Sequence, residues 1–423
     1  MPRKRSTRLP LAVFKALVPK PLRKRRARRA APASVGALKA ARASARSASK
    51  IARTASSASH LVKPSTRKAT ARSASSRTTK PRTAKPRTTA RKPARFSARG
   101  KAASRAGKGT WRQARFTGVA GSRSYRVYVP RGLRRTTKVP LLLALHGCAQ
   151  KGQDFAAGTR FNDLADKHKF LVVYPEQSVA HNVQRCWNWF RPGHQSRAQG
   201  EPAILAGIVR EVQEQSTLWR IDPTRVYVAG ISAGGAMAVV LAATYPELFA
   251  AVGVHSAPPY RSASGPVNAL AAMQGASARG GGPHASLPGP LAGPMPPMIV
   301  FQGTADGTVR SVNAQRIADQ WLAYHRRDTG DSARAPVGEP RVATTVPARP
   351  VSARSRRGYR VSRWYSGGRK VPELWIVDGL GHAWSGGSAD GSYTDTRGPR
   401  ATTEMWKFFS AQRSAAAAVR LAS

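Results

Sequence analysis

From residue 111 onward, short apolar segments alternate with longer amphipathic ones, and this rhythm predicts strands and helices in turn. Alternation from Phe116 through Tyr125, Val127 and Val129 indicates a strand with one buried face, and the apolar run 139–145 indicates a buried parallel strand. Short apolar strands that alternate with helices are typical of an α/β fold with a mostly parallel central sheet. Further strands are expected at 170–174, 226–229, 251–255, 298–302 and 374–377, and helices at 161–168, 201–218, 233–245 and 401–411.

Two segments interrupt this rhythm. Residues 262–296 are rich in Gly, Pro, Ala and Ser, and residues 328–357 have a similar composition with added Arg. Each lies between two expected strands and has too few apolar residues for a core of its own. We therefore expect low-complexity surface insertions within one domain that spans residues 109–412, followed by a short C-terminal tail at 413–423.

Residues 1–108 have a different composition from the rest of the chain. The protein has 423 residues with 72 Lys and Arg against 19 Asp and Glu, and its first hundred residues hold 30 of the basic side chains and no acid. A segment of Arg, Lys, Ala, Ser, Thr and Pro buries too little apolar surface to offset a backbone ordering cost of roughly 1–2 kcal/mol per residue. The sequence predicts a disordered basic N-terminal tail.

The start of the chain does not have the pattern of a membrane span. No stretch reaches the roughly 18 apolar residues that a spanning helix needs. The apolar run 9–18 is interrupted by Lys15, and a Pro-Lys-Pro-Leu-Arg-Lys-Arg-Arg segment follows where a signal peptide would be cleaved. Plain disorder is the favoured interpretation, and a cleavable signal and an amphipathic helical patch remain as alternatives.

The tail has the charge of a non-specific polyanion-binding segment. Its thirty positive charges have no interspersed acid to pair with, and no aromatic residue lies between Phe14 and Phe96 to stack on bases. Nucleic acid, anionic lipid head groups and acidic polymers are therefore equivalent partners for residues 1–100. The alternative is a tail that only aids solubility or is removed in the cell.

A serine nucleophile is indicated by the segment Gly-Ile-Ser-Ala-Gly at 230–234. The motif directly follows an expected strand and directly precedes an apolar helix, which is the setting of a strained strand-to-helix turn that exposes the oxygen of Ser232. A glycine-rich turn that only packs a helix on a strand is the weaker interpretation of the same five residues.

A serine hydroxyl needs a base and an orienting acid, and both are expected later in the chain. Of the histidines beyond residue 255, His382 follows the expected strand 374–377 on a loop at the same sheet edge as Ser232. Asp306 follows the strand 298–302, where its carboxylate would hold the imidazole in one tautomer. Asp378 is the rival acid, four residues before His382 on the same loop.

Five segments closely resemble the catalytic domain of the poly(3-hydroxybutyrate) depolymerase family of esterases, which is related to feruloyl and acetylxylan esterases. They occur in the family's order, and the resemblance extends over about residues 111–410. The segments are Leu-His-Gly-Cys-Ala-Gln at 145–150, Cys-Trp-Asn-Trp-Phe at 186–190, Gly-Ile-Ser-Ala-Gly-Gly-Ala-Met at 230–237, Gly-Thr-Ala-Asp at 303–306, and Gly-Leu-Gly-His-Ala-Trp-Ser-Gly-Gly at 379–387.

The resemblance implies an α/β-hydrolase fold and a catalytic triad of Ser232 as nucleophile, Asp306 as orienting acid and His382 as general base. It also implies an oxyanion hole built from the backbone N–H groups of Cys148 and Ala233. It implies an ester or polyester substrate, no cofactor and no metal, and an extracellular location; a cytoplasmic location follows if the tail is not an export signal.

The chain's only cysteines, Cys148 and Cys186, both fall in these family segments. We favour a disulfide between them that stiffens the oxyanion loop, and two reduced buried thiols remain as the alternative. Aromatic residues of the same segments, Trp187, Trp189 and Trp384, are candidates to face an apolar polyester or an aromatic acyl group, with ordinary core packing as the equal alternative.

These observations favour a serine carboxylic-ester hydrolase that resembles poly(3-hydroxybutyrate) depolymerases. The alternative within enzymes is a feruloyl- or acetylxylan-type esterase. A different class, a polyanion- or granule-binding protein in which the tail dominates, is disfavoured by the complete set of Ser232, Asp306 and His382.

Overall fold

The computed structural model describes residues 108–215, 217–276, 294–328, 342–346, 356–366 and 369–414. Contacts divide the chain into two units, Met1–Pro86 and Arg87–Ser423, and every described residue belongs to the second. The predicted disorder of the N-terminal tail therefore concerns residues outside the described ones, apart from Lys108. Much of both expected insertions and the end of the C-terminal tail also lie outside them.

The described residues form a ten-stranded sheet in the order β1-β2-β4-β3-β5-β6-β7-β10-β9-β8. Its six inner strands, from β4 to β10, run parallel, and antiparallel strands flank them at both edges. The expected α/β fold with a mostly parallel sheet is confirmed. The strands are β1 Thr110–Gly118, β2 Gly121–Val129, β3 Lys138–Leu145, β4 Leu171–Pro175, β5 Arg220–Ile231, β6 Ala251–His255, β7 Met298–Gly303, β8 Val342–Val346, β9 Tyr359–Ser366 and β10 Arg369–Val377, and a separate pair is β11 Trp384–Ser385 and β12 Thr394–Asp395.

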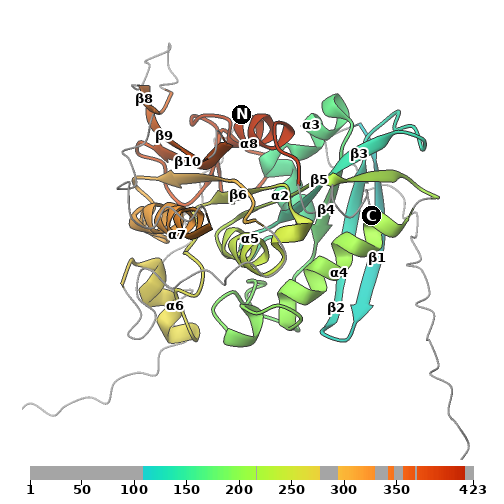
Figure 1. Ribbon diagram of the computed structural model, residues 1–423, viewed down its shortest axis with the longest axis horizontal. Helices are drawn as coiled ribbons and strands as arrows, with labels where there is room; N and C mark the ends of the chain where they lie inside the picture. The colour runs from blue at the N-terminus through green and yellow to red at the C-terminus, as the bar shows by residue number, and fades with distance from the viewer. Residues whose placement is uncertain are drawn as a thin grey trace, which may run out of the picture. The chain divides into compact units, whose positions relative to one another are not determined.

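Helices cover both faces of this sheet (Figure 1). One core cluster joins the sheet to α4, α5, α6 and α7, and a second joins it to α2, α3 and α8. Because side chains alternate along a strand, Leu143 of β3 enters the first cluster and Leu142 the second. The helices are α2 Gly152–Thr159, α3 Phe161–His168, α4 Gly200–Glu214, α5 Ala233–Thr244, α6 Pro266–Met273, α7 Val312–Asp328 and α8 Ala401–Ser410, with short 3-10 turns at Pro192–His194 and Pro246–Leu248.

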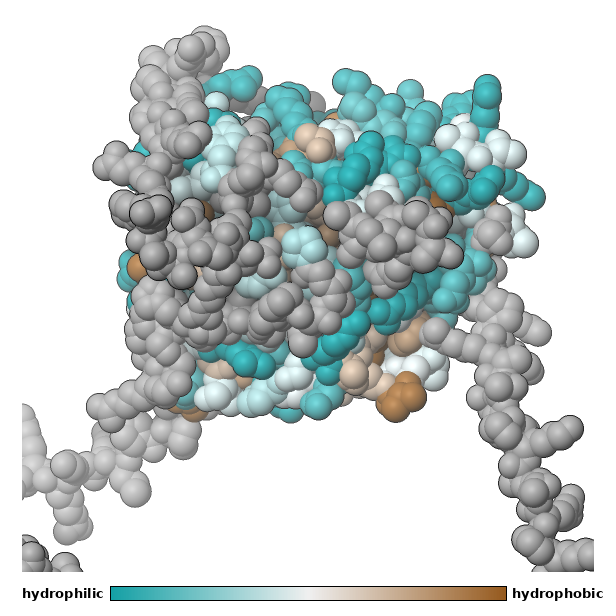
Figure 2. All heavy atoms as spheres, in the orientation of Figure 1, coloured by the Kyte–Doolittle hydropathy of each residue, from teal (hydrophilic) through white to brown (hydrophobic). Residues whose placement is uncertain are grey.

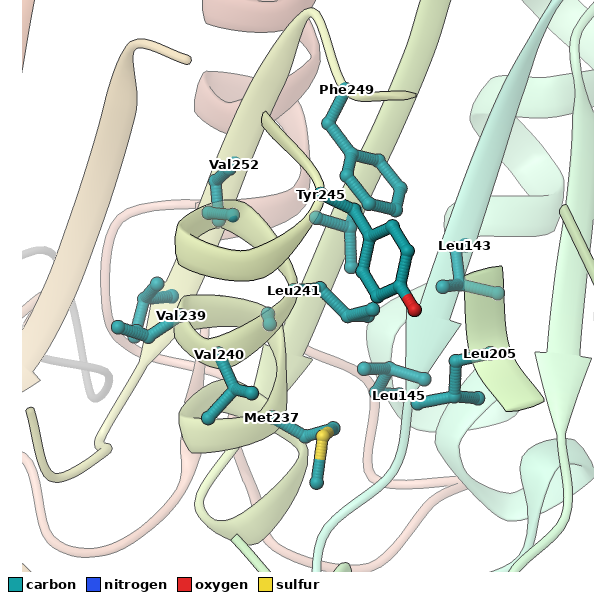
Figure 3. Packing of buried hydrophobic residues seen from close by; sticks show 14 of the residues in the cluster. Leu143, Leu145, Leu205, Met237, Val239, Val240, Leu241, Tyr245, Phe249 and Val252 are labelled. Carbon is teal, nitrogen blue, oxygen red and sulfur yellow. The ribbon is translucent and has the colours of Figure 1, made fainter. Parts of the chain in front are cut away.

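Helix α5 lies at the centre of the first cluster. Every one of its residues is buried, as expected for a helix that is apolar all round. Figure 3 shows Val252 of β6, Leu145 of β3 and Leu205 of α4 around this helix. The helix is therefore held rigidly, and so is its N-terminus at residue 233.

The structure corrects the prediction of one strand through residues 116–129. The chain forms a β-hairpin there, in which Gly118 pairs with Gly121 and the latter has a φ of 121°, a value that favours glycine. The alternation of apolar and polar residues extends across the turn because β1 and β2 bury the same face of the sheet. Phe116 of β1 and Tyr125 of β2 are both buried on that face. The helices α2 and α6 and the strands β8 and β9 were not predicted, and α6 and β8 lie within the two expected insertions.

Candidate active site

The turn between β5 and α5 holds Ser232 in an unusual backbone conformation, with φ 55° and ψ −122°. The flanking glycines allow it. A Cβ on Gly230 would lie 2.4 Å from the carbonyl of Gly234, and a Cβ on Gly234 would lie 2.2 Å from the carbonyl oxygen of Leu145. The Gly-x-Ser-x-Gly pattern is therefore a packing requirement, which brings the serine turn against the end of β3.

An acid–base pair lies on the loops that follow β7 and β10. The Nδ1 atom of His382 donates a hydrogen bond to Oδ2 of Asp306 over 2.8 Å. The two loops are joined at the backbone as well, because Ala305 N–H donates to the carbonyl of Leu380 at 3.0 Å. Only the tertiary structure brings these residues together, since 76 positions separate them in the chain.

The carboxylate of Asp306 is buried and fully engaged. Its Oδ1 accepts from the backbone N–H groups of Thr308 and Val309 at 2.9 and 2.8 Å, and its Oδ2 also accepts from Nε2 of Gln302 at 3.1 Å. Burial by itself raises the pKa of Asp306, but the hydrogen bond and positive charge of His382 and the two backbone donors outweigh it, so the pKa is lowered. The group stays ionised and can hold the imidazole in one orientation.

The rival acid, Asp378, is exposed at the end of β10. Its backbone N–H donates to Gly358 and its carbonyl accepts from Arg357, contacts that tie it to the start of β9. Among the described residues its carboxylate makes no hydrogen bond to His382. The structure therefore places Asp306, and not Asp378, beside the histidine.

A second histidine, His255, joins the serine turn to the loop that carries His382. Its carbonyl accepts from Ser232 N–H at 2.9 Å, and its Nε2 accepts from Ser385 N–H at 3.0 Å. Its ring stacks on Trp384 with centroids 5.1 Å apart. The buried His255 therefore holds the turn at Ser232 and the loop that carries His382 in contact with each other.

The imidazole ring of His255 is neutral when it makes these contacts. Burial lowers its pKa to about 3, although the nearby Asp306 opposes that shift. Because Nε2 accepts a hydrogen bond, the proton is on Nδ1, which lies 3.0 Å from Oγ of Ser256. His255 is not among the residues predicted from the sequence, although its place at the carboxyl end of β6, the strand beside β5, could have indicated it.

The loop at residues 146–150 lies against the serine turn. A Cβ on Gly147 would lie 3.5 Å from the carbonyl oxygen of Ile231, and a Cβ on Gly234 would lie 2.5 Å from that of His146. Cys148 and Cys186 form a disulfide that joins this loop to the segment after β4. Two further bonds attach it there: Ala149 N–H donates to Gln184 O at 2.7 Å, and Trp187 Nε1 donates to His146 O at 3.1 Å.

Two backbone donors remain available at this junction. Within the described part of the chain, neither Cys148 N–H nor Ala233 N–H donates to a protein acceptor. Cys148 is on the loop at 146–150, and Ala233 is the first residue of α5, where the helix dipole adds positive potential. Both are free to meet a developing negative charge beside Ser232.

A buried ion-pair network supports the segment after β4 to which the loop at 146–150 is bonded. Glu201, with no exposed surface, accepts through Oε1 from Arg123 Nη2 at 3.0 Å, from Gln177 Nε2 at 2.5 Å and from Asn188 Nδ2 at 2.9 Å. Its Oε2 accepts from Asn188 N–H at 2.6 Å. Gln177 continues the network to the loop, because its Nε2 also donates to Cys186 O at 2.9 Å.

The charge on Glu201 is preserved despite its burial. Burial alone raises the pKa of Glu201, but His194, the backbone N–H of Asn188 and the charge of Arg123 together lower it below its usual value. Gln177 N–H also donates to Nε2 of the buried His146 at 3.2 Å, and burial lowers the pKa of that ring to about 4. The network is therefore a fixed arrangement in which polar partners hold one buried carboxylate and one guanidinium.

The three tryptophans proposed to face substrate do not do so. The exposed fractions of Trp187, Trp189 and Trp384 are 0%, 5% and 1%. Trp384 donates from Nε1 to Thr402 Oγ1 at 2.9 Å and contacts His255, so it supports the histidine loop. That prediction was wrong because aromatic residues beside a site often brace its loops from below, and sequence alone does not separate the two roles.

Other site types are not found among the described residues. No helix there is long and apolar enough to cross a membrane. In the same residues, no group of three or more His, Cys, Asp and Glu side chains is arranged to hold a metal ion.

The fold and the site geometry define an α/β-hydrolase: a mostly parallel sheet with helices on both faces, a serine on the strained turn after β5, and an acid–histidine pair on later loops of the same sheet edge. The chain belongs to the family described as Esterase PHB depolymerase, whose model matches residues 123–343, more than half of the chain.

Among curated proteins, the chain is 32% identical over 265 residues to poly(3-hydroxyalkanoate) depolymerase C of Paucimonas lemoignei, covering 60% of this chain and 57% of that protein. It is 32% identical over 204 residues to feruloyl esterase B of Neurospora crassa, covering 46% and 67%. Among solved structures, it shares its fold with an acetyl xylan esterase from Aspergillus awamori, with TM-score 0.53, 20% identity and coverage of 70% of this chain and 98% of that one. The chain thus spans little more than half of the Paucimonas protein.

Proposed function

We propose that this protein is a serine carboxylic-ester hydrolase that works through an acyl-enzyme. The observation that carries the proposal is the hydrogen bond from His382 to the buried Asp306, on the sheet edge where Ser232 occupies its strained turn. An ionised carboxylate that holds an imidazole in one tautomer is the arrangement that lets the imidazole activate a serine hydroxyl as a nucleophile.

In the proposed reaction, Nε2 of His382 takes the proton of Ser232 as the serine oxygen attacks the ester carbonyl carbon. The carbonyl oxygen becomes an anion that accepts hydrogen bonds from the N–H groups of Cys148 and Ala233. As the tetrahedral intermediate collapses, His382 gives the proton to the departing alcohol. A water molecule then reacts in the same way, which releases the acid and restores the serine hydroxyl.

For the substrate, we propose a polyhydroxyalkanoate such as poly(3-hydroxybutyrate). Membership of the family and the 32% identity to the Paucimonas depolymerase support this choice. The identity to the Neurospora feruloyl esterase supports the second candidate, a feruloyl- or acetylxylan-type ester. Both candidates use the same chemistry at Ser232 and differ in the acid that is released.

We further propose that residues 1–108 are a functional segment separate from the esterase domain at 109–412. The acid-free basic composition supports non-specific binding to a polyanion. A purely structural polyanion- or granule-binding protein is the alternative, and it requires no ester hydrolysis.

One experiment tests the hydrolase and the substrate together. The full-length protein is incubated with p-nitrophenyl butyrate, with amorphous poly(3-hydroxybutyrate) and with feruloylated arabinoxylan, and the released acids are identified. Ser232→Ala should abolish all hydrolysis and leave the fold intact, because only one oxygen is lost, whereas Ser410→Ala on the exposed side of α8 should keep full activity. Activity within tenfold of the wild type in a folded Ser232→Ala variant would exclude the mechanism.

A further inference from the structure

Exposed cations gather on the edge of the sheet opposite the candidate active site. The inner strands are parallel, so their amino ends all lie on this edge, whereas Ser232, Asp306 and His382 follow carboxyl ends. Lys138 begins β3 and Arg220 begins β5, and both are exposed. Figure 2 shows hydrophilic residues over the upper right of the domain, the region labelled α3 and β3 in Figure 1.

Register and hydrogen bonds bring these charges close together. Lys138 and Arg220 are direct partners on neighbouring strands, which lie about 4.8 Å apart. Arg131, just after β2, accepts at its carbonyl from Nζ of Lys169 at 2.7 Å, and Lys169 is just before β4. The exposed turn between Arg131 and Lys138 also carries Arg134 and Arg135. The amino-edge cluster is defined as Arg131, Arg134, Arg135, Lys138, Lys169 and Arg220.

These charges lack acidic partners. The chain has no Asp or Glu before Asp154, so β1, β2 and β3 and the turn at 131–138 contain none. Two acids near the cluster are already engaged: Asp166 accepts from Tyr128 and from backbone N–H groups, and Asp222 pairs with Arg225 at 2.6 Å. In the described part of the chain no member of the amino-edge cluster forms an ion pair. Like charges side by side on neighbouring strands are unfavourable by themselves, so this edge is suited to an anionic partner.

We propose that the amino-edge cluster binds the phosphate backbone of double-stranded nucleic acid without base specificity. Four adjacent strands, β2-β4-β3-β5, span about 15 Å, and that length of duplex carries roughly nine phosphates. Four of the six members are arginines, whose planar groups bind phosphate through paired hydrogen bonds. Phosphate contacts of this kind position a duplex but do not read its sequence.

Nucleic acid fits this edge better than a membrane does. The exposed large apolar residues of the described chain do not lie on β2, β4, β3 or β5: Val119 is at the tip of the β1–β2 hairpin and Val267 is on α6, and Tyr365 is on β9 at the far end of the sheet. An interfacial membrane site needs such side chains to enter the lipid.

The first described residue, Lys108, also lies at the amino edge, where its N–H donates to Asp166. The described part of the domain therefore begins beside the amino-edge cluster.

The inference is independent of ester hydrolysis, because the cluster and Ser232 are at opposite ends of the strands. In the full-length protein, Arg134→Gln, Arg135→Gln, Lys138→Gln and Arg220→Gln are combined. A matched control combines Arg191→Gln, Arg261→Gln, Arg356→Gln and Arg360→Gln, which are exposed arginines away from this edge. Both variants lose four positive charges, so a difference between them reports position and not net charge.

Binding of a random-sequence 30-bp duplex is measured by fluorescence anisotropy across salt concentrations, and thermal melting verifies folding. The amino-edge variant should lose affinity at least tenfold near 150 mM salt, and its slope of log affinity against log salt should become shallower by about 3 to 4. The control should retain a slope within one unit of the wild type. Equal losses in both variants, or no loss in either, would overturn the proposal. The proposal would also be overturned if the amino-edge variant kept its affinity for the duplex but lost its binding to vesicles that contain 30% phosphatidylserine. The surface would then be a lipid site.

Discussion

At the scale of single residues, Asp306 shows how burial and hydrogen bonding together determine a charge. Its side chain is almost fully buried, which by itself favours the neutral acid. The hydrogen bond and charge of His382 and the backbone N–H groups of Val309 and Thr308 nevertheless lower its pKa. A neutral acid would offer the imidazole no fixed negative partner. The local donors therefore maintain the form that the proposed mechanism uses.

We predict that Asp306→Asn lowers kcat for p-nitrophenyl butyrate by about 10³- to 10⁴-fold, because the tautomer of His382 and the imidazolium that forms during reaction both lose their partner. Steady-state kinetics of the purified variant measure this. Asp378→Asn is the matched control and should change kcat less than threefold, since that side chain is exposed. A larger loss in the Asp378 variant would show that the acid has been assigned to the wrong residue.

At the scale of elements, the loop at 146–150, which carries the proposed oxyanion donor Cys148, is a short segment held by contacts to several parts of the domain. The disulfide, the indole of Trp187 and the Glu201 network all attach it or its partner segment to the domain. A loop with free N–H donors needs such support, because donors are effective only when they are fixed before the charge develops. The support comes from β2, the segment after β4, and α4, which are distant in sequence.

Glu201→Gln is predicted to lower the free energy of unfolding by about 3 kcal/mol, because Arg123 stays buried without a counter-charge. It should also lower kcat more than it raises KM, since the loop carries Cys148 N–H. Urea unfolding and steady-state kinetics measure the two effects. As a control, Glu404→Gln removes an exposed pair with Lys407 and should cost less than about 1 kcal/mol. Unchanged stability and kcat in Glu201→Gln would show that the network does not support the site.

At the scale of the whole molecule, two buried neutral histidines make the fold sensitive to acid. Burial lowers the pKa of His255 to about 3 and that of His146 to about 4, whereas an unfolded histidine titrates near 6.5. Between these values the unfolded chain binds protons that the folded chain does not. Stability is therefore lost as the pH falls from about 6.5 toward 4.

At pH 5 each such histidine should cost roughly 2 kcal/mol of unfolding free energy relative to neutral pH. His255→Gln keeps an acceptor for Ser385 N–H and removes one titrating group. We therefore predict that this variant loses about 2 kcal/mol less than the wild type between pH 7 and pH 5, as measured by urea unfolding at both values. Equal losses in the two proteins would mean that His255 is not the source of the acid sensitivity.

The basic N-terminal segment should also act on the molecule as a whole. A chain that begins at residue 109 is predicted to bind random-sequence DNA more weakly than the full-length protein, with a shallower dependence on salt. Even 6 to 10 phosphate contacts lose about a thousandfold or more in affinity between 50 and 200 mM salt. Mobility-shift experiments at both salts measure this, and p-nitrophenyl butyrate hydrolysis verifies the folding of the shorter chain. Equal binding by both chains at low salt would eliminate the tether and leave the esterase proposal unaffected.

The order of strands and helices was largely determined by local patterns. Strand β6 and helix α3 have the predicted bounds, and α5 ends one residue before its predicted end. Hydrophobic periodicity and the glycines around Ser232 are local properties, because they depend on a few neighbouring side chains. Asp306 and His382 were selected in the same way, from their places after expected strands.

Only the tertiary structure decided which residues meet. Asp378 and Asp306 both follow strands, and the pairing of β10 with β7 and of their loops places the second beside His382. His255, Glu201 and the amino-edge cluster gain their roles from strands that are neighbours in the sheet but distant in the chain. The buried tryptophans were misjudged for the same reason. Whether a side chain faces a substrate or supports a loop depends on what packs above it, and that is determined by contacts between remote segments.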